Sequence, residues 1–274
     1  MLIKRVLKNK LALPGLLVVV FVILASLFAS QVAPFDPLKL SLSKRIQAPF
    51  DEHVFGTDHF GRDILSRVLY GGRVSLMVGV LSVLFASIVG IILGATGGYF
   101  GGKIDYAIVL VLDALMSFPP LLLTIGLMAV MGQGVKNIVI AMALSSIPTY
   151  GRVVRGAVLS IRQKEYIEAA RNAGSGDLKI IFLHVLPNTI APLIVVTTMG
   201  VASAILTEAA LSFVGLGVPG PDPSWGNILA DGRDYISQAP WITIFPGLAI
   251  TLTVLGFNLL GDGLRDVLDP KLKQ

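Results

Sequence analysis

The chain has 274 residues, of which 54% are hydrophobic and only 14% are charged. Soluble domains carry about 25% charged residues, so this composition argues against a soluble globular protein and favours one whose solvent is largely lipid. The absence of cysteine excludes a disulfide framework and a thiolate metal site. Basic residues that flank apolar runs account for the net charge of +5 without a nucleic acid partner.

Six apolar runs approach or exceed the length of about 20 residues that a helix needs to cross a bilayer. In chain order they cover residues 11–30, 74–96, 105–131, 135–150, 189–216 and 241–260. The sequence therefore predicts an all-α polytopic membrane protein with six transmembrane helices. Pro119-Pro120 predicts a kink in the third helix, because proline lacks a backbone donor. The first run also follows basic residues, as a signal peptide does, but it is long for one.

Lysine and arginine placement predicts the orientation of the chain. With the N-terminus and the C-terminus both in the cytoplasm, 14 of the 22 basic residues lie on the inner side, as the positive-inside rule favours. Residues 1–73 then form an N-terminal helix and an extracytoplasmic loop. Residues 74–274 form a core of five helices with a cytoplasmic loop at about 152–188.

The cytoplasmic loop is predicted to form two short helices. Good helix formers fill residues 163–173, and Gly174 and Gly176 end the first helix because glycine tolerates the left-handed conformation of a C-cap. A second helix over residues 177–185 is expected to close at Pro187. An ordinary amphipathic connector would have the same spacing.

The small side chains of Ala169 and Ala170 allow another protein to approach the first helix closely, with Glu168 beside them as a charged anchor. Together with Gly174 and Leu186-Pro187, these residues resemble the EAA loop of ABC importer permeases. His184 departs from that pattern, in which an aliphatic residue is frequent. The resemblance implies that the loop is a coupling helix, which docks on an ATPase subunit.

Further motifs resemble the dipeptide, oligopeptide and nickel importer permeases, and they point to the C-type subunit of a two-permease pair. They are Phe55-Gly56-Thr57-Asp58, Gly61-Arg62-Asp63, Ser66-Arg67, Gly72–Leu76, Glu208–Phe213, Gly215-Leu216-Gly217, Pro223–Gly226, Gly261–Asp266 and Leu268-Asp269-Pro270. The resemblance implies a type I ABC importer permease fold in the inner membrane of a prokaryote. Its implied substrate is a di- or oligopeptide, with nickel or a metal chelate as the alternative.

The resemblance also implies the partners of this chain. They are a second homologous permease subunit in a heterodimer, two cytoplasmic ATPase subunits that bind ATP and Mg, and an extracytoplasmic solute-binding protein. The chain itself is expected to be no enzyme and to hold no cofactor or metal. Gly97, Gly102 and Lys103 have the spacing of a phosphate-binding loop, but Ile104 stands where a hydroxyl should hold magnesium. We interpret this segment as an inner turn between two spans.

Two ionisable residues, Asp113 and Glu208, lie inside apolar runs. Such residues are costly in a membrane, so each is either part of the transport pathway or a buried hydrogen-bonded brace. Gly90 and Gly94 are spaced for close helix packing, which we expect to be within the chain.

In the first outer loop, His53, Asp58, His59 and Asp63 allow a metal site. A folded element that meets the binding protein, with Arg62 and Asp63 as braces, is the preferred interpretation. A transporter driven by an ion gradient and a membrane scaffold without transport activity are the alternatives from other functional classes.

Overall fold

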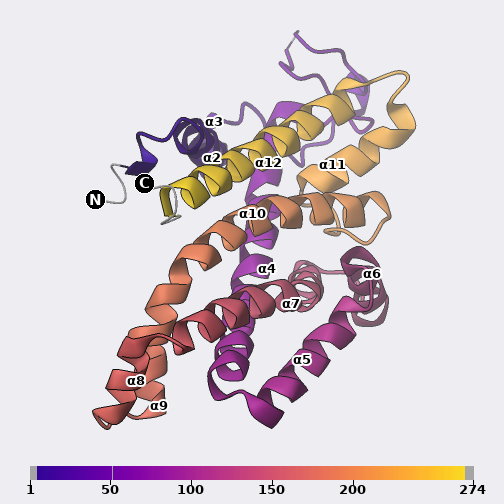
Figure 1. The fold of residues 1–274 in the computed structure, drawn as a ribbon. Helices are drawn as coiled ribbons and strands as arrows, with labels where there is room; N and C mark the ends of the chain where they lie inside the picture. Colours follow the sequence, from indigo (N-terminus) through magenta and orange to yellow (C-terminus); the bar gives the residue numbers. More distant parts are fainter. Residues whose placement is uncertain (1–4, 51, 269–274) are drawn as a thin grey trace.

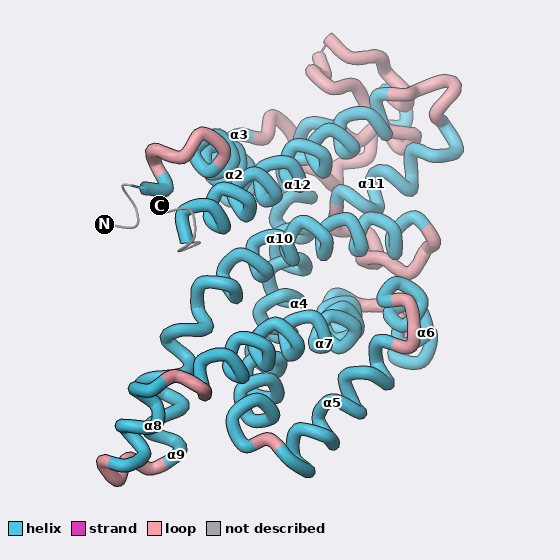
Figure 2. Tube along the Cα trace, in the orientation of Figure 1, coloured by secondary structure: helices cyan, strands magenta, loops and turns pink. Residues whose placement is uncertain are grey.

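The computed structural model describes residues 5–50 and 52–268, and every regular element in these ranges is helical (Figures 1 and 2). The principal helices are α2 (Ala12–Leu27), α3 (Ala29–Val32), α4 (Ile64–Phe100), α5 (Gly102–Met116), α6 (Pro120–Met131), α7 (Val135–Arg162), α8 (Glu165–Asn172), α9 (Asp177–Ile180), α10 (Leu186–Phe213), α11 (Trp225–Gly232) and α12 (Trp241–Leu268). Three shorter turns cover Leu42–Lys44, Ile181–Val185 and Arg233–Tyr235.

The six predicted spans correspond to six helical segments in the described ranges. Four are long and apolar enough to cross a membrane: α4, α7, the continuous segment Asp177–Phe213, and α12. Taken together, the bent pair α5 and α6 passes the same test as a fifth span, and α2, with 16 residues, is apolar but shorter than the others. The prediction of an all-α polytopic membrane protein is confirmed.

The third span is broken at the predicted prolines. α5 ends at Met116, α6 begins at Pro120, and the two helices meet at 86°. The backbone leaves the helical region at Pro119, because a residue that precedes a proline is disfavoured in the α conformation. The break turns α6 across the end of the bundle (Figure 1).

Two helix ends differ from the prediction. α4 begins at Ile64 instead of Val74, because the Asp63 carboxylate caps the helix by accepting the Ser66 N–H at 2.7 Å. The predicted domain boundary at residue 73 therefore lies inside α4. α7 runs on to Arg162, so residues 152–162 are helical and the cytoplasmic loop is shorter than predicted. Two basic residues of this stretch, Arg152 and Arg155, form ion pairs with Asp113 and Asp105 of α5.

The centre of the bundle is the contact between α4 and α7. A Cβ atom at Gly90 would lie 2.5 Å from the Tyr150 Cβ, and one at Gly94 would lie 2.5 Å from the Gly151 carbonyl oxygen. Only glycine therefore permits this approach of the two backbones, and the predicted intrachain packing of the pair is confirmed.

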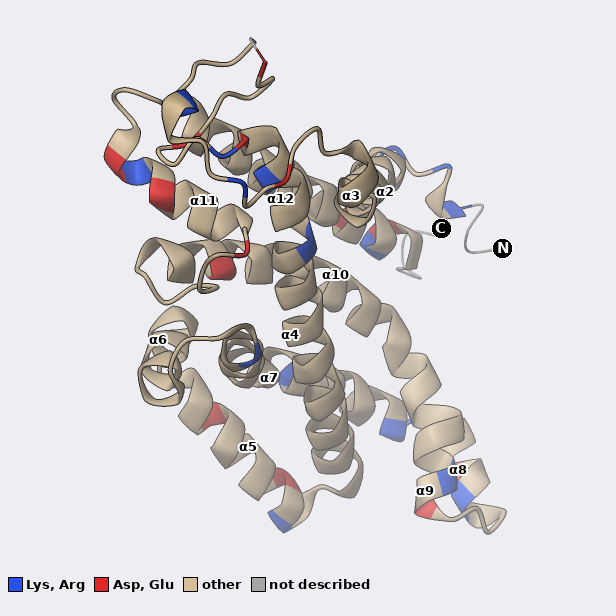
Figure 3. Cartoon of the chain, turned by 180° about the vertical axis from the view of Figure 1, so that it is seen from behind, with Lys and Arg blue, Asp and Glu red and all other residues tan. Residues whose placement is uncertain are grey.

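Loops and charges gather at two opposite ends of the molecule (Figures 1 and 3). One end holds residues 33–63 together with α11, and the other holds α8 and α9. Most of α4 and α10 between these ends is uncharged in Figure 3. The turn that carries Gly101 and Lys103 joins α4 to α5, and Gly101 adopts a φ of +70° there. This is the predicted turn between two spans.

Candidate functional site

The predicted coupling residues lie on α8, at one end of the molecule. Ile167 is 1% exposed and packs into the bundle, whereas Glu168 and Ala169 are exposed and Ala170 is half-buried. α8 therefore has one anchored side and one side that presents a carboxylate and a small side chain to its surroundings.

The end of α8 is built as predicted at Gly174 but not at Gly176, which has a φ of −68° and directly precedes α9. Gly174 has a φ of +78°, and its N–H donates to the Arg171 carbonyl at 3.0 Å. The next N–H, that of Ser175, donates to the Ala170 carbonyl at 3.1 Å. These two bonds form a Schellman C-cap, which stops the helix and turns the chain towards α9.

Tyr99, near the C-terminal end of α4, ties the α8–α9 segment to the bundle. Its hydroxyl donates to the Asp177 carboxylate at 2.7 Å, and its carbonyl accepts a bond from Arg162 at 2.9 Å. The Arg171 guanidinium donates to the same hydroxyl at 3.4 Å, a contact that raises the pKa of Arg171. Because Ile167 also packs in this region, α8 and the end of α4 are joined by polar and apolar contacts.

The second helix of this segment does not close at Pro187, and that prediction is wrong. α9 passes through a π-helical turn at Ile181–Val185 directly into α10. A proline demands extra room one turn back along a helix, and the wider π turn supplies it. Leu186 is half-buried and Pro187 is exposed in the first turn of α10.

Glu208 is fully buried near the C-terminal end of α10. Its carboxylate accepts hydrogen bonds from the hydroxyls of Ser75, Ser212 and Ser224 at 3.0, 3.0 and 2.9 Å. Ser75 lies on α4, and Ser224 caps the first turn of α11. Glu208 thus joins three segments that are distant in the sequence.

Asp113 has a different environment. Its side chain is half-exposed in the isolated chain and accepts a bond from Arg152 on α7 at 2.6 Å. The structure brings neither Asp113 nor Glu208 into contact with the other or with α8.

Polar contacts among mostly buried side chains hold the segment of residues 33–63. The Arg62 guanidinium donates to Asp58 at 2.6 Å and reaches Asp231 at 3.3 Å, and the His53 ring lies 2.8 Å from Asp63. Arg62 and Asp63 both brace the segment, but through different partners. In residues 5–50 and 52–268, no group of three or more His, Asp or Glu side chains is arranged to hold a metal ion.

His59 belongs to the same region. Its ring stacks on Tyr235 with the centroids 4.9 Å apart and the planes 10° from parallel. Burial against this ring lowers the pKa of His59 below its usual value, and the nearby Asp58 opposes the shift.

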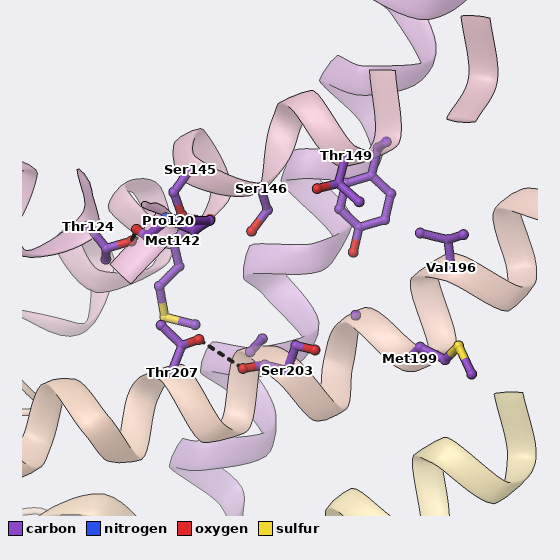
Figure 4. A pocket seen from close by; sticks show the side chains of 13 residues that line it. Pro120, Thr124, Met142, Ser145, Ser146, Thr149, Val196, Met199, Ser203 and Thr207 are labelled. Atoms are coloured by element: carbon purple, nitrogen blue, oxygen red, sulfur yellow. Dashed lines mark hydrogen bonds between the residues drawn. The ribbon is translucent and has the colours of Figure 1, made fainter. Parts of the chain in front are cut away.

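A cavity of about 340 Å³ lies between α6, α7 and α10 (Figure 4). Its lining includes seven hydroxyl side chains: Thr124, Ser145, Ser146, Thr149, Tyr150, Ser203 and Thr207. Sequence reasoning missed this site. The hydroxyl residues do recur at helical spacing in α7 and α10, but their spacing does not tell which helix faces meet.

The helical arrangement is similar to that of solved ABC transporters. A chain of the inward-facing MetNI methionine ABC transporter is 20% identical and matches with a TM-score of 0.60 over 73% of this chain and 95% of that chain. A chain of an amino acid ABC transporter with histidines is 15% identical and matches with a TM-score of 0.56, over 73% and 92%. These likenesses show that the chain has the type I ABC importer permease fold.

Residues 86–274 match the family of binding-protein-dependent transport system inner membrane components, and residues 1–49 match the N-terminal transmembrane domain of oligopeptide transport permease C. The dipeptide transport system permease protein DppC of Alkalihalophilus pseudofirmus is 47% identical over 98% of this chain and 89% of its own length. The di/tripeptide permease DppC of Pseudomonas aeruginosa is 45% identical, over 97% and 89%. The glutathione permease GsiD of Pectobacterium atrosepticum is 44% identical, over 98% and 90%.

The chain therefore belongs to the family of binding-protein-dependent transport system inner membrane components. The resemblance noted in its loops is confirmed.

Proposed function

We propose that this chain is a permease subunit of an ATP-driven importer of di- or oligopeptides. The observation that carries the proposal is the exposed side of α8, which presents Glu168 and Ala169 at one end of the bundle while Tyr99 and Ile167 anchor the helix to α4. Relatives named for dipeptide, di/tripeptide and glutathione transport support a short peptide as the substrate. Nickel or a metal chelate is the alternative substrate, and ion-gradient-driven transport is the distant alternative mechanism.

The orientation follows from the charges. α8, α9 and the turn before α5 face the cytoplasm, and residues 33–63 with α11 face outwards. With this orientation, 14 of the 22 basic residues lie on the inner side, Arg171 and Lys179 among them, which supports the assignment. Lys4, Lys271 and Lys273, which also favour it, lie outside the described residues. Both termini are then in the cytoplasm, and the membrane is the inner membrane of a prokaryote.

Energy enters through partner subunits. Two cytoplasmic ATPase subunits bind ATP and Mg and dock on the exposed side of α8. They alternate between states that differ in the bound nucleotide. This chain has no enzymatic activity of its own. A second, homologous permease completes the pathway, and an extracytoplasmic solute-binding protein delivers the peptide. The permease has an outward-open and an inward-open conformation. The ATPase subunits shift the equilibrium between them only to the extent that their ATP-bound state binds one conformation more tightly than the other.

The anchored side of α8 explains how a movement of α8 would reach the membrane-spanning helices. Tyr99 bonds to Asp177 at 2.7 Å, and Asp177 begins the helical segment that continues into α10. A displacement of α8 by the ATPase is therefore transmitted to α4 and α10 together. Leu186 and Pro187 directly follow the π turn, at the start of α10.

The test uses the complete transporter, expressed with and without Glu168→Ala in this chain. We expect the variant to lose copurifying ATPase subunit and ATP-dependent dipeptide uptake. Gln163→Ala, an exposed substitution just before α8, is the matched control and should keep both. Normal assembly and normal uptake in the Glu168→Ala variant would contradict the coupling role. Uptake that continues without the ATPase but stops when the proton gradient is dissipated would favour the secondary transporter.

A further inference from the structure

The cavity between α6, α7 and α10 has the size and the chemistry of a small-molecule site. Its volume of about 340 Å³ falls in the range of ligand pockets, which hold about 300–1,000 Å³. Within the described residues, no Asp, Glu, Lys, Arg or His contributes to its lining. The lining therefore favours a ligand that forms hydrogen bonds and needs no oppositely charged partner.

Part of the hydroxyl lining is already used by the protein. Thr124 donates to the Pro120 carbonyl at 2.8 Å, Ser145 to the Met142 carbonyl at 2.9 Å, and Thr207 to the Ser203 carbonyl at 2.9 Å. These bonds shape the helices.

Other hydroxyls of the lining are available to a ligand. Those of Ser146, Thr149 and Ser203 form no hydrogen bond to another residue in the described ranges, and Thr149 and Ser203 are exposed. Figure 4 shows Ser146 and Thr149 of α7 across the same space from Ser203 of α10. A ligand between the two helices can therefore bond to both of them.

Tyr150 is placed at this cavity by two glycines. A Cβ atom at Gly200 of α10 would lie 2.1 Å from the Tyr150 hydroxyl, and one at Gly90 of α4 would lie 2.5 Å from the Tyr150 Cβ. The ring is 2% exposed, yet its hydroxyl has no partner within residues 5–50 and 52–268. Both neighbouring helices thus leave room for a phenol that has no hydrogen-bond partner in the part of the chain that the structure describes.

We propose that this cavity binds the main chain of the passing peptide through Ser146, Tyr150 and Ser203, and that its neutrality keeps it indifferent to the charge of the peptide side chains. This inference rests on the proposed function. Peptide N–H and C=O groups need partners when they leave water. A hydroxyl donates and accepts, so it serves either group in either peptide orientation.

The absence of charge is the second part of the proposal. A fixed charge in a site of reduced dielectric would attract peptides of one sign and repel those of the other by several times the thermal energy. A permease that passes many different short peptides has to avoid such a preference.

The experiment introduces the missing charge in the complete transporter, reconstituted in liposomes with its partner permease, ATPases and binding protein. We expect Ser203→Asp to raise the ratio of Ala-Lys to Ala-Asp uptake by about tenfold, and Ser203→Lys to lower it by about tenfold. Peptide binding to the binding protein is unaffected, because that protein is unchanged. The same two substitutions at Thr198, on α10 but outside the cavity lining, are the control and should leave the ratio as it is.

Labelling gives a second measurement if the charged variants fail to assemble. The chain has no cysteine, so Ser203→Cys and Ser146→Cys each introduce a single thiol. We expect a water-soluble methanethiosulfonate reagent to modify both, and Ala-Ala delivered by the binding protein to slow the modification at least about threefold.

The outcomes separate the two proposals. Peptide uptake by the unsubstituted transporter, with a ratio that neither charged variant changes, overturns the assignment of the cavity alone. So does thiol labelling that peptide leaves unaltered. An unsubstituted transporter that carries no peptide overturns the proposed function, and the assignment of this ligand with it.

Discussion

The Asp113 carboxylate on α5 lies 2.6 Å from the Arg152 guanidinium on α7, and Asp105, two turns earlier on α5, is held by two bonds from Arg155 at 2.5 and 2.7 Å. Leu112 is the one residue of α5 that is buried. The two ion pairs add polar contacts to the packing of Leu112 against Gly151 of α7.

We predict that the two pairs differ in strength. Asp105→Asn should loosen α5 by about 1–2 kcal/mol, because it removes a bidentate, partly shielded pair. Asp113→Asn should cost less than about 1 kcal/mol, because both of its partners are half-exposed. Hydrogen exchange of residues 102–116 in the reconstituted chain measures both effects. Equal protection in the two variants would show that the ion pairs do not hold α5.

The C-cap of α8 gives a prediction with its own control. Gly174→Ala should destabilise the α8–α9 turn by about 1–2 kcal/mol, because its φ of +78° is unfavourable for a side chain. Gly176→Ala should be tolerated, since Gly176 has a φ of −68° and open space around its Cβ position. Limited proteolysis at residues 173–177 and recovery of bound ATPase subunit distinguish the variants. Similar behaviour of both would refute a conformational requirement at Gly174.

We predict that the main role of the cluster around Glu208 is to stabilise the fold. Glu208→Ala would leave three serine hydroxyls without their acceptor and would open a cavity, at a cost of about 2–4 kcal/mol. Glu208→Gln keeps an oxygen acceptor and fills the space, so it should be milder. The yield and thermal midpoint of the detergent-purified chain report this difference. A stable Glu208→Ala protein that fails only in transport would instead support the pathway role.

The folded segment of residues 33–63 should be less stable in acid because of His59. Its folded pKa is lowered by burial, so the unfolded segment binds a proton more readily than the folded one. The stabilising contribution is therefore complete above the unfolded pKa of about 6.5 and is lost as the pH falls below it. Asp58, Asp231, Arg62 and Arg67 are the charged groups that face the ring.

Hydrogen exchange of residues 53–63 at about pH 7.5 and about pH 5.5 tests the role of His59. After correction for the intrinsic pH dependence of exchange, protection should fall in acid in the native chain. It should stay constant in the His59→Gln variant, which has no group to protonate at this position. An equal loss of protection in both proteins would assign the acid sensitivity to another residue.

The membrane class, the number of spans and the break at Pro119 could be predicted from the sequence, because each depends on residues that are close together in the chain. Run length decides whether a helix can span the bilayer, and proline acts on its own turn. The family could be recognised because the residues around Glu168 and Gly174 form contiguous motifs. The start of α4 at Ile64 was missed although Asp63 is a local capping residue, since polar residues near the helix start hid the signal.

Other features depend on contacts between distant segments. The extension of α7 to Arg162 relies on Asp105 and Asp113 of α5, and the burial of Glu208 relies on serines from α4 and from the start of α11. The neutral cavity exists because Gly90 and Gly200 bring α4 and α10 against Tyr150. Local hydrophobicity determines that a helix forms in the membrane, but it leaves the rotation of that helix open. Side-chain packing between helices sets that rotation, and with it which hydroxyls and carboxylates meet.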